Sequence, residues 1–376
     1  MEAPDSSKHE AEKLLEQYLR SDDVSEIHLS GLDRLFIRKA EDLYRLQADF
    51  QSLEQYSNFV NRILENSSIP RRINPDGTMV DGGNPIIDTA WVDPETGNRA
   101  RVNIITKPCT LEGPVVTICK LTSSKFGFDD LVERGSMTTA MATFIEKTMR
   151  ARCNLLIGGN TGAGKTTLAN VILKEVFRKS PEDKVVIIED TPELTLDLPT
   201  VTYIQAYENP VDPFRSVGLE LLTRNAKRMR PDRLIVGEVR GGEATHMLAA
   251  MRSGSEGSLC TIHSNSTRSA LDALVDYCCM SNEGGDKSLA GRTIESTIDL
   301  VVQLQLLPDR KHRTIEIAEV DYAKDDYKFI TRPIFSYDEK TDSHKVGVRP
   351  SERFIEKLKN RGVEVVEDMF RRNFSL

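Results

Sequence analysis

The sequence predicts an α/β protein of two domains, a small N-terminal α+β domain followed by a larger domain with a mainly parallel sheet. The chain has 376 residues, which suffices for two or three units at roughly 150 residues each. Up to about residue 125, helical and strand patterns are mixed, whereas beyond it short apolar runs alternate with helices. Such runs are typical of parallel strands that helices cover on both faces. We therefore expect domains at 1–125 and 126–376.

In the first domain, apolar residues at helical spacing predict a helix from Ala11 to Leu19. VSEIHLS and RLFIRKA then alternate as strands, and the turn at 31–33 between them favours a hairpin. A second helix is expected over about 52–66, and later strands end in VVTICKL. The segment 123–130, SSKFGFDD, is the predicted linker because Ser, Gly and Asp interrupt regular structure.

In the second domain, five apolar runs are predicted as strands: NLLIGG, KVVIIED, TVTYIQAY, RLIVGEV and SLCTIH. Helices are expected between them, from about Gly164 to Lys179 and up to about Met229 and Arg252. The stretch 323–376 is highly charged and is interpreted as a C-terminal extension that contains a helix over 352–360.

The charge pattern argues against a protein that coats nucleic acid. The chain has 50 basic and 58 acidic residues, a net charge of −8, and so lacks a global basic field. The acidity belongs to the N-terminal third, where residues 1–130 hold 22 acidic against 15 basic side chains. The rest of the chain is close to neutral.

Cysteine spacing and hydropathy exclude several other classes. The six cysteines form no C-x-x-C pair, so we expect free thiols rather than disulfides or a zinc site. The charged start does not resemble a signal peptide, and eighteen apolar residues nowhere run together. Any membrane association is expected to be peripheral.

The strongest motif is GNTGAGKT, which satisfies G-x-x-x-x-G-K-[ST] between an apolar strand and a helix. Its glycines let backbone N–H groups turn toward phosphate oxygens, and the helix presents its positive end to the same anion. We expect Lys165 to contact the β and γ phosphates of ATP and the Thr166 hydroxyl to ligate Mg²⁺. The predicted nucleotide-binding residues here are Gly159, Asn160, Thr161, Gly162, Ala163, Gly164, Lys165, Thr166 and Thr167.

Side chains that suit phosphate hydrolysis follow the next apolar runs. KVVIIED and the residues after it place three carboxylates, Glu189, Asp190 and Glu193, at one strand end. Glu238 follows RLIVG, where a carboxylate can hold the Mg²⁺ shell through water or orient the attacking water. His263 ends the next run, where a hydrogen bond to the γ phosphate or to Glu238 is expected.

Basic residues gather around the Glu238 strand. Between Arg224 and Arg252 there are seven basic against three acidic residues. A solvated helix face is one interpretation. We favour phosphate sensing and subunit contact for some of these arginines, because guanidinium groups suit phosphate.

The motifs IIEDTPEL, NAKRMRPDRLIVGEVRGGEA and GSLCTIHSNS, in order after GGNTGAGKTT, resemble the secretion ATPase superfamily of PilT, GspE, CpaF and conjugative type IV secretion motors. RGGEA and RMRPDR are most similar to the CpaF and conjugative branch. The resemblance implies a RecA-like P-loop ATPase domain and a homo-hexamer that holds ATP between its two domains. It also implies work at the cytoplasmic face of a bacterial inner membrane for type IV secretion, conjugation or a Tad or type IV pilus-like machine, with platform or channel proteins as partners.

The resemblance assigns roles to individual positions. Glu193 is expected to activate water, and Arg101 to approach the phosphates. The matching residues are Lys165 and Thr166 in Walker A, Glu193 in the Asp box, Glu238 in Walker B, His263 in the His box, Arg228 and Arg240 around Walker B, and Arg101 in the first domain. Three positions depart from the family pattern, since Cys119, Tyr207 and Ser255 stand where it has arginine, arginine and histidine.

Two other functions remain open at this point. A nucleic-acid translocase of RecA-like fold would use the arginine cluster, although the net charge of −8 argues against it. A scaffold that binds ATP but hydrolyses it negligibly would be compatible with the departures at Cys119 and Ser255. The favoured function is an ATP-hydrolysing motor.

Overall fold

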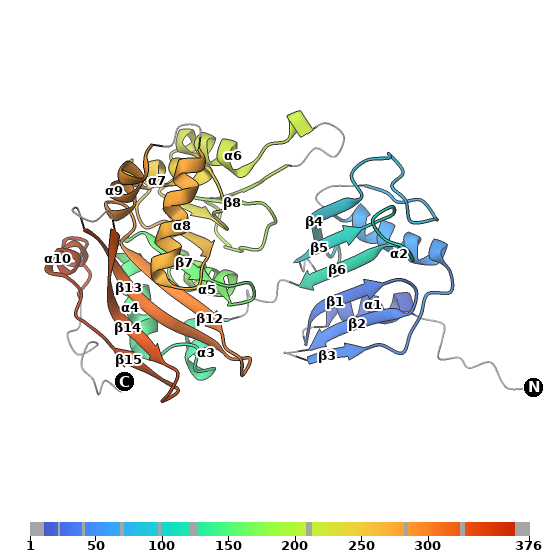
Figure 1. Cartoon of the computed structure of the whole chain (residues 1–376), viewed down its shortest axis with the longest axis horizontal. Coiled ribbons are helices and arrows are strands. Elements are labelled where there is room, and N and C mark those ends of the chain that lie inside the picture. Colours follow the sequence, from blue (N-terminus) through green and yellow to red (C-terminus); the bar gives the residue numbers. More distant parts are fainter. Residues whose placement is uncertain are drawn as a thin grey trace, which may run out of the picture. The chain divides into compact units, whose positions relative to one another are not determined.

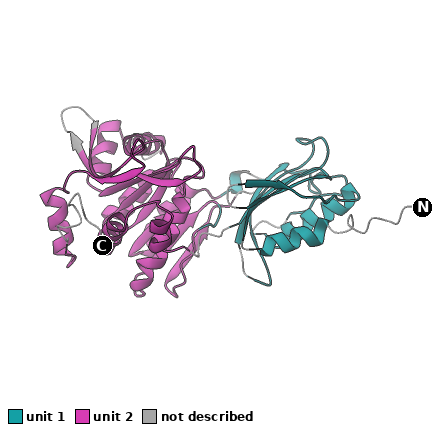
Figure 2. Cartoon of the chain, turned by 90° about the horizontal axis from the view of Figure 1, so that it is seen from below, with its two compact units in different colours: residues 1–122, 191–193, 208–216 teal, residues 123–190, 194–207, 217–376 magenta. Residues whose placement is uncertain are grey.

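The computed structural model divides into two compact units, each with its own sheet (Figures 1 and 2). One unit comprises residues 1–122, 191–193 and 208–216, and the other comprises the remainder. The structure describes residues 11–21, 23–39, 42–67, 71–96, 99–120, 126–207, 213–281, 285–323 and 328–364.

The first unit contains a six-stranded antiparallel sheet in the order β3-β2-β1-β6-β5-β4. The predicted hairpin is confirmed as β1 and β2, whereas β3 was not predicted because all four of its residues are exposed and show no alternation. The strands are β1 Val24–Ser30, β2 Arg34–Lys39, β3 Asp42–Arg45, β4 Ile86–Val92, β5 Arg99–Ile105 and β6 Val115–Lys120.

Two helices cover one face of this sheet, α1 (Ala11–Arg20) and α2 (Leu53–Glu65). The helix α2 begins after Ser52, whose side chain caps it by accepting a hydrogen bond from the backbone N–H of Gln55. Leu15 and Phe59 of these helices share a core with Ile27 of the sheet. The opposite face keeps the polar residues that alternate with these apolar ones.

The second unit contains a nine-stranded sheet in the order β15-β14-β13-β12-β7-β11-β10-β8-β9. The strands from β12 to β9 are parallel, and β13, β14 and β15 continue the sheet antiparallel. The five predicted strands are present as β7 to β11. The strands are β7 Leu155–Gly159, β8 Val185–Glu189, β9 Val201–Gln205, β10 Arg233–Val236, β11 Leu259–His263, β12 Leu300–Leu306, β13 His312–Ala323, β14 Lys328–Asp338 and β15 Ser343–Val346.

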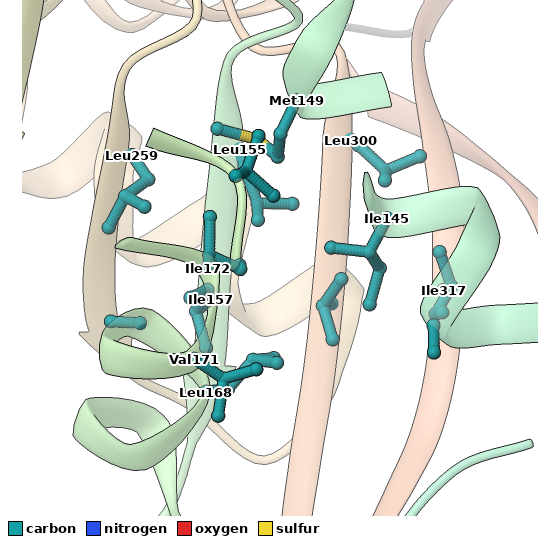
Figure 3. Packing of buried hydrophobic residues seen from close by; sticks show 14 of the residues in the cluster. Ile145, Met149, Leu155, Ile157, Leu168, Val171, Ile172, Leu259, Leu300 and Ile317 are labelled. Carbon is teal, nitrogen blue, oxygen red and sulfur yellow. The ribbon is translucent and has the colours of Figure 1, made fainter. Parts of the chain in front are cut away.

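Helices cover both faces of the second sheet. Leu155 and Ile157 of β7 pack with Ile145 and Ile172 on one face (Figure 3), whereas Leu156 joins a separate core on the other. The helices are α3 Phe128–Glu133, α4 Thr139–Arg150, α5 Lys165–Glu175, α6 Leu219–Ala226, α7 Glu243–Arg252, α8 Thr267–Met280, α9 Lys287–Glu295 and α10 Glu352–Asn360, with 3₁₀ turns η3 Phe177–Lys179, η4 Pro213–Arg215 and η5 Lys227–Met229.

Two boundaries differ from the sequence prediction. The predicted linker is too long, because its residues 128–130 form the first turn of α3, where two acidic side chains favour a helix start. Residues 123–125 of that linker lie outside the described residues. The helix expected from about Gly164 to Lys179 ends as an α-helix at Glu175 and continues as η3.

Candidate nucleotide-binding site

The P-loop connects the buried strand β7 to α5, and its geometry suits an anion. Gly162 and Gly164 have φ angles of 73° and 95°, in the left-handed region that glycine adopts without strain. Helix α5 begins at Lys165, so the backbone N–H groups of its first turn face the loop. Phosphate oxygens are the ligand that such a loop and helix end bind best.

Lys165 is held inside this loop. Its side chain is buried, and Nζ donates hydrogen bonds to the backbone oxygens of Gly159, at 2.9 Å, and Asn160, at 3.1 Å. A third contact joins Nζ to Nδ1 of His263 at 3.2 Å. The ammonium group therefore lies where phosphate oxygens would enter the loop.

His263 connects Lys165 to Glu238. Its Nε2 lies 2.6 Å from Oε1 of Glu238, which is one of the two contacts expected from the sequence. Because an ammonium group can only donate, Nδ1 of His263 must accept from Lys165. The ring proton then resides on Nε2, which donates to the Glu238 carboxylate. The structure thus brings together three predicted site residues in one hydrogen-bonded chain.

The order of the strands explains why Lys165, His263 and Glu238 meet. We call these three hydrogen-bonded residues the Lys165 chain. The P-loop follows β7, His263 ends β11, and Glu238 comes just after β10, and these strands are neighbours in the order β7-β11-β10. All are parallel, so their carboxyl ends meet at one edge of the sheet, where open α/β folds bind ligands. His263 lies on the middle strand and therefore contacts residues from both sides.

The loop that carries Glu193 is anchored on its C-terminal side. The buried carboxylate of Glu189 accepts a hydrogen bond from the backbone N–H of Leu194 at 3.0 Å. The buried amide of Asn170, on α5, accepts another from Thr195 at 2.8 Å. Sequence reasoning missed Asn170, although a polar residue within the apolar run LANVIL was the available signal.

The other predicted arginines are not part of the Lys165 chain. Arg240 forms an ion pair with Asp190. Arg228 is exposed on η5 and has no hydrogen bond or ion pair among the residues that the structure describes. In the first unit, Arg101 on β5 pairs with Asp88 at 2.7 Å, and the hydrogen bond that Arg101 donates to the Asp88 carboxylate raises the pKa of Arg101.

Arg233, from the basic cluster around β10, stabilises the fold instead of facing phosphate. Its side chain is fully buried at the start of β10, where Nε pairs with Asp183 at 2.7 Å. It also donates to the backbone oxygen of Gly257 and lies 4.3 Å from the ring of Phe177. Burial lowers the pKa of Arg233, although Asp183 opposes the shift.

The structure gives the surroundings of Ser255 and Cys119, two of the departures from the family pattern, and of Lys120 beside Cys119. Ser255 is buried, and its hydroxyl donates to the backbone oxygen of Pro231 at 2.8 Å. Burial raises the pKa of Cys119 to about 11, which keeps its thiol protonated at neutral pH. Lys120 donates to the backbone oxygens of Tyr18 and Ser21, so its charge lies at the C-terminal end of α1.

The donor set suits a magnesium ion held mainly by phosphate and water. Thr166, in the first turn of α5, and Glu238 offer oxygen atoms at the P-loop edge of the sheet. The described residues contain no group of three or more His, Cys, Asp or Glu side chains that could hold a metal by themselves. Mg²⁺ often binds through one or two protein oxygens together with substrate phosphates. Among the same residues, no helix combines the length and hydropathy needed to cross a bilayer.

The sheet, the P-loop and the Lys165 chain together define a P-loop nucleotide-binding protein of two domains. The model of the family described as Type II/IV secretion system protein matches residues 8–337. The chain therefore belongs to this family, which confirms the resemblance seen in the motifs.

Several curated relatives are conjugal transfer proteins. TrbB of Rhizobium radiobacter is 38% identical over 200 residues, which cover 53% of this chain and 58% of that protein. A probable TrbB of Sinorhizobium fredii is 34% identical over 214 residues, covering 57% and 62%. The chain thus spans about three fifths of the length of these relatives.

Solved structures show the same fold. The ATPase DotB of Yersinia pseudotuberculosis has a TM-score of 0.57 at 16% identity, covering 87% of this chain and 84% of its own. The pilus retraction motor PilT with bound ADP has a TM-score of 0.55 at 14% identity, covering 93% and 86%. These similarities confirm the predicted two-domain α/β fold class.

Proposed function

We propose that this protein is an ATPase that powers a bacterial type IV secretion or conjugation machine. The observation that carries the proposal is the hydrogen-bonded chain of Lys165, His263 and Glu238 at the P-loop. Family membership and the names of the relatives, TrbB and the type IV secretion system protein VirB11, support the same system. A motor for a Tad or type IV pilus-like machine is the alternative within the same family of ATPases.

In this proposal the side chains of the site divide the tasks of binding phosphate, magnesium and water. The P-loop N–H groups and Lys165 bind the phosphates, and Glu238 orients the attacking water or holds the Mg²⁺ shell. Bound Mg²⁺ would neutralise charge on the β and γ phosphates, with Thr166 as a ligand and Glu238 joined through water. Glu193, Arg228, Arg240 and Arg101 are proposed to complete the site as water activator and phosphate contacts.

The assembly is proposed to be a homo-hexamer at the cytoplasmic face of the inner membrane, bound to platform or channel proteins. Residues 1–130 hold 22 acidic and 15 basic side chains, so partners that contact this part of the protein are expected to be basic. A native mass measurement tests the ring. Release of the protein from inner-membrane fractions by high salt tests the electrostatic attachment.

ATP turnover by the purified protein tests the proposal. Lys165→Ala should abolish nucleotide binding and turnover, whereas Glu238→Gln should retain binding and lower kcat by about 10²-fold or more, because a neutral amide lacks the charge with which the carboxylate orients the attacking water and the Mg²⁺ shell. Lys174→Ala is the matched control, since Lys174 lies on the same helix and donates to the backbone oxygen of Phe126 instead.

Two outcomes would replace the proposal. Tight ATP binding without turnover in any assembly state would favour a nucleotide-dependent scaffold. Turnover that DNA stimulates, with a steep dependence on salt, would favour a nucleic-acid translocase.

A further inference from the structure

A buried glutamine on β12, the neighbour of the P-loop strand β7 in the sheet, forms hydrogen bonds to Ser264, the residue after His263. Gln303, on β12, is 2% exposed. Its Nε2 donates to the backbone oxygens of Ser264, at 3.1 Å, and Leu304, at 3.2 Å, and its Oε1 accepts from the Ser264 hydroxyl at 2.8 Å. Gln303 therefore holds Ser264 at two points, by its side chain and its backbone. We call this pair the Gln303–Ser264 clamp.

The side chains of the Gln303–Ser264 clamp lie against Gly158 of the P-loop strand β7. Gly158 of β7 lies opposite Gln303 in the parallel pair of β7 and β12. A Cβ at Gly158 would lie 2.4 Å from Oγ of Ser264 and 2.5 Å from Oε1 of Gln303. The backbone N–H of Ser264 also donates to the oxygen of Gly159 at 3.4 Å. The clamp thus joins the carboxyl-end portions of β7, β11 and β12 at once.

A second buried amide braces the same strands at their amino ends. Asn154, 3% exposed, precedes β7 and accepts at Oδ1 from the backbone N–H of Ser258 at 3.1 Å. Its Nδ2 donates to the backbone oxygen of Thr297 at 2.8 Å. Asn154 and Gln303 therefore make similar buried hydrogen bonds. Only the clamp adjoins His263.

We propose that Gln303 is a positioning residue for ATP hydrolysis, which acts through Ser264 to fix the backbone of His263. This inference rests on the proposed function. When Lys165 turns to a phosphate, Nδ1 of His263 loses its partner, and the ring is held by Glu238 and by its own backbone. A loosened backbone would let the imidazole drift from the position where it meets the γ phosphate.

The experiment compares the two amides. Gln303→Met and Asn154→Leu each replace an amide with an apolar side chain of similar size, and both should lower Tm because buried polar groups lose partners. We expect Gln303→Met alone to lower kcat, by about 10- to 100-fold, the usual cost of a misplaced group. The affinity for a fluorescent ADP should change by about twofold at most, because the P-loop contacts that bind the nucleotide in its ground state are retained.

Ser264 supplies variants that keep the test decisive if Gln303→Met does not fold. Ser264→Ala removes the hydroxyl bond and should lower kcat, whereas Ser264→Thr keeps the hydroxyl and should restore it. An unchanged kcat in Gln303→Met or Ser264→Ala, or an equal loss in Asn154→Leu, overturns the inference. If the wild-type protein shows no turnover, the proposed function fails and this inference fails with it. If the wild type is active and the variants show either of the overturning results, the inference alone fails.

Discussion

Removing the carboxylate of Asp183 should destabilise the second unit strongly. Asp183 is 3% exposed and accepts hydrogen bonds from Nε of Arg233, at 2.7 Å, and from Nη2 of Arg152, at 2.5 Å. In Asp183→Ala the direct contacts left to the buried guanidinium of Arg233, among the described residues, are two backbone oxygens and the ring of Phe177, all of them neutral. An uncompensated buried charge of this kind costs about 3–5 kcal/mol.

Thermal unfolding measured by circular dichroism tests the magnitude. For a unit of about 250 residues, each kcal/mol lowers Tm by roughly 2–4 °C, so Asp183→Ala should lose about 6–20 °C. The matched control is Glu146→Ala, whose pair with Lys179 at 3.0 Å is far more exposed. That variant should lose less than about 1 kcal/mol.

A double variant separates the charge from the packing. Asp183→Leu with Arg233→Met removes both charges and keeps apolar volume, so it should recover much of the lost stability. The reasoning is wrong if Asp183→Ala melts within the range of the Glu146→Ala control. It is also wrong if the double variant is less stable than Asp183→Ala alone.

Three further results are expected in the first unit. The hydrogen bond from His28 lowers the pKa of Glu26 to about 2, below its ordinary 4.5, so this stabilisation is present above about pH 4.5 and lost toward pH 2. Glu26→Gln should therefore flatten the acid branch of a stability–pH curve. Burial raises the pKa of Cys119 to about 11, so mass spectrometry should find it alkylated far more slowly than the exposed Cys109. Lys120→Met should lower the Tm of the first unit without changing ADP affinity, and weaker ADP binding would instead give Lys120 a phosphate contact.

In the second unit, the strands that local patterns predicted most clearly are those with short, wholly apolar runs, whereas β1 and β2 of the first unit were recognised by alternation. β7 and β8 are buried at all five of their positions, which makes them easy to recognise. β12 to β15 were missed because their patterns are mixed, and β14 contains Pro333, which argues against a strand in a sequence. Helix α4 was missed although Phe144, Ile145 and Met149 recur at helical spacing.

The motifs gave the candidate site residues, but for His263 they left two partners open, Glu238 and the γ phosphate. Whether His263 would meet Glu238 depended on β11 lying between β7 and β10, and strand order is not encoded in any one segment. Arg233 belongs to the basic cluster around β10, and a count of basic residues cannot reveal that one of them is buried. Its partner Asp183 lies 50 residues earlier in the chain. Gln303 was missed for the same reason, because its role depends on Ser264 in a neighbouring strand.

The Lys165 chain gives the proposed mechanism a way to couple binding to hydrolysis. Lys165 contacts two carbonyl oxygens and one imidazole nitrogen, and an anionic phosphate would offer its ammonium group stronger, charge-assisted hydrogen bonds than these contacts. That exchange frees Nδ1 of His263, while Nε2 stays on Glu238. The freed nitrogen then faces the entering γ phosphate only if the backbone of His263 stays in place, which is the task of the Gln303–Ser264 clamp. In the proposed mechanism, phosphate binding by Lys165 would thereby set the orientation of His263, which lies next to the carboxylate of Glu238.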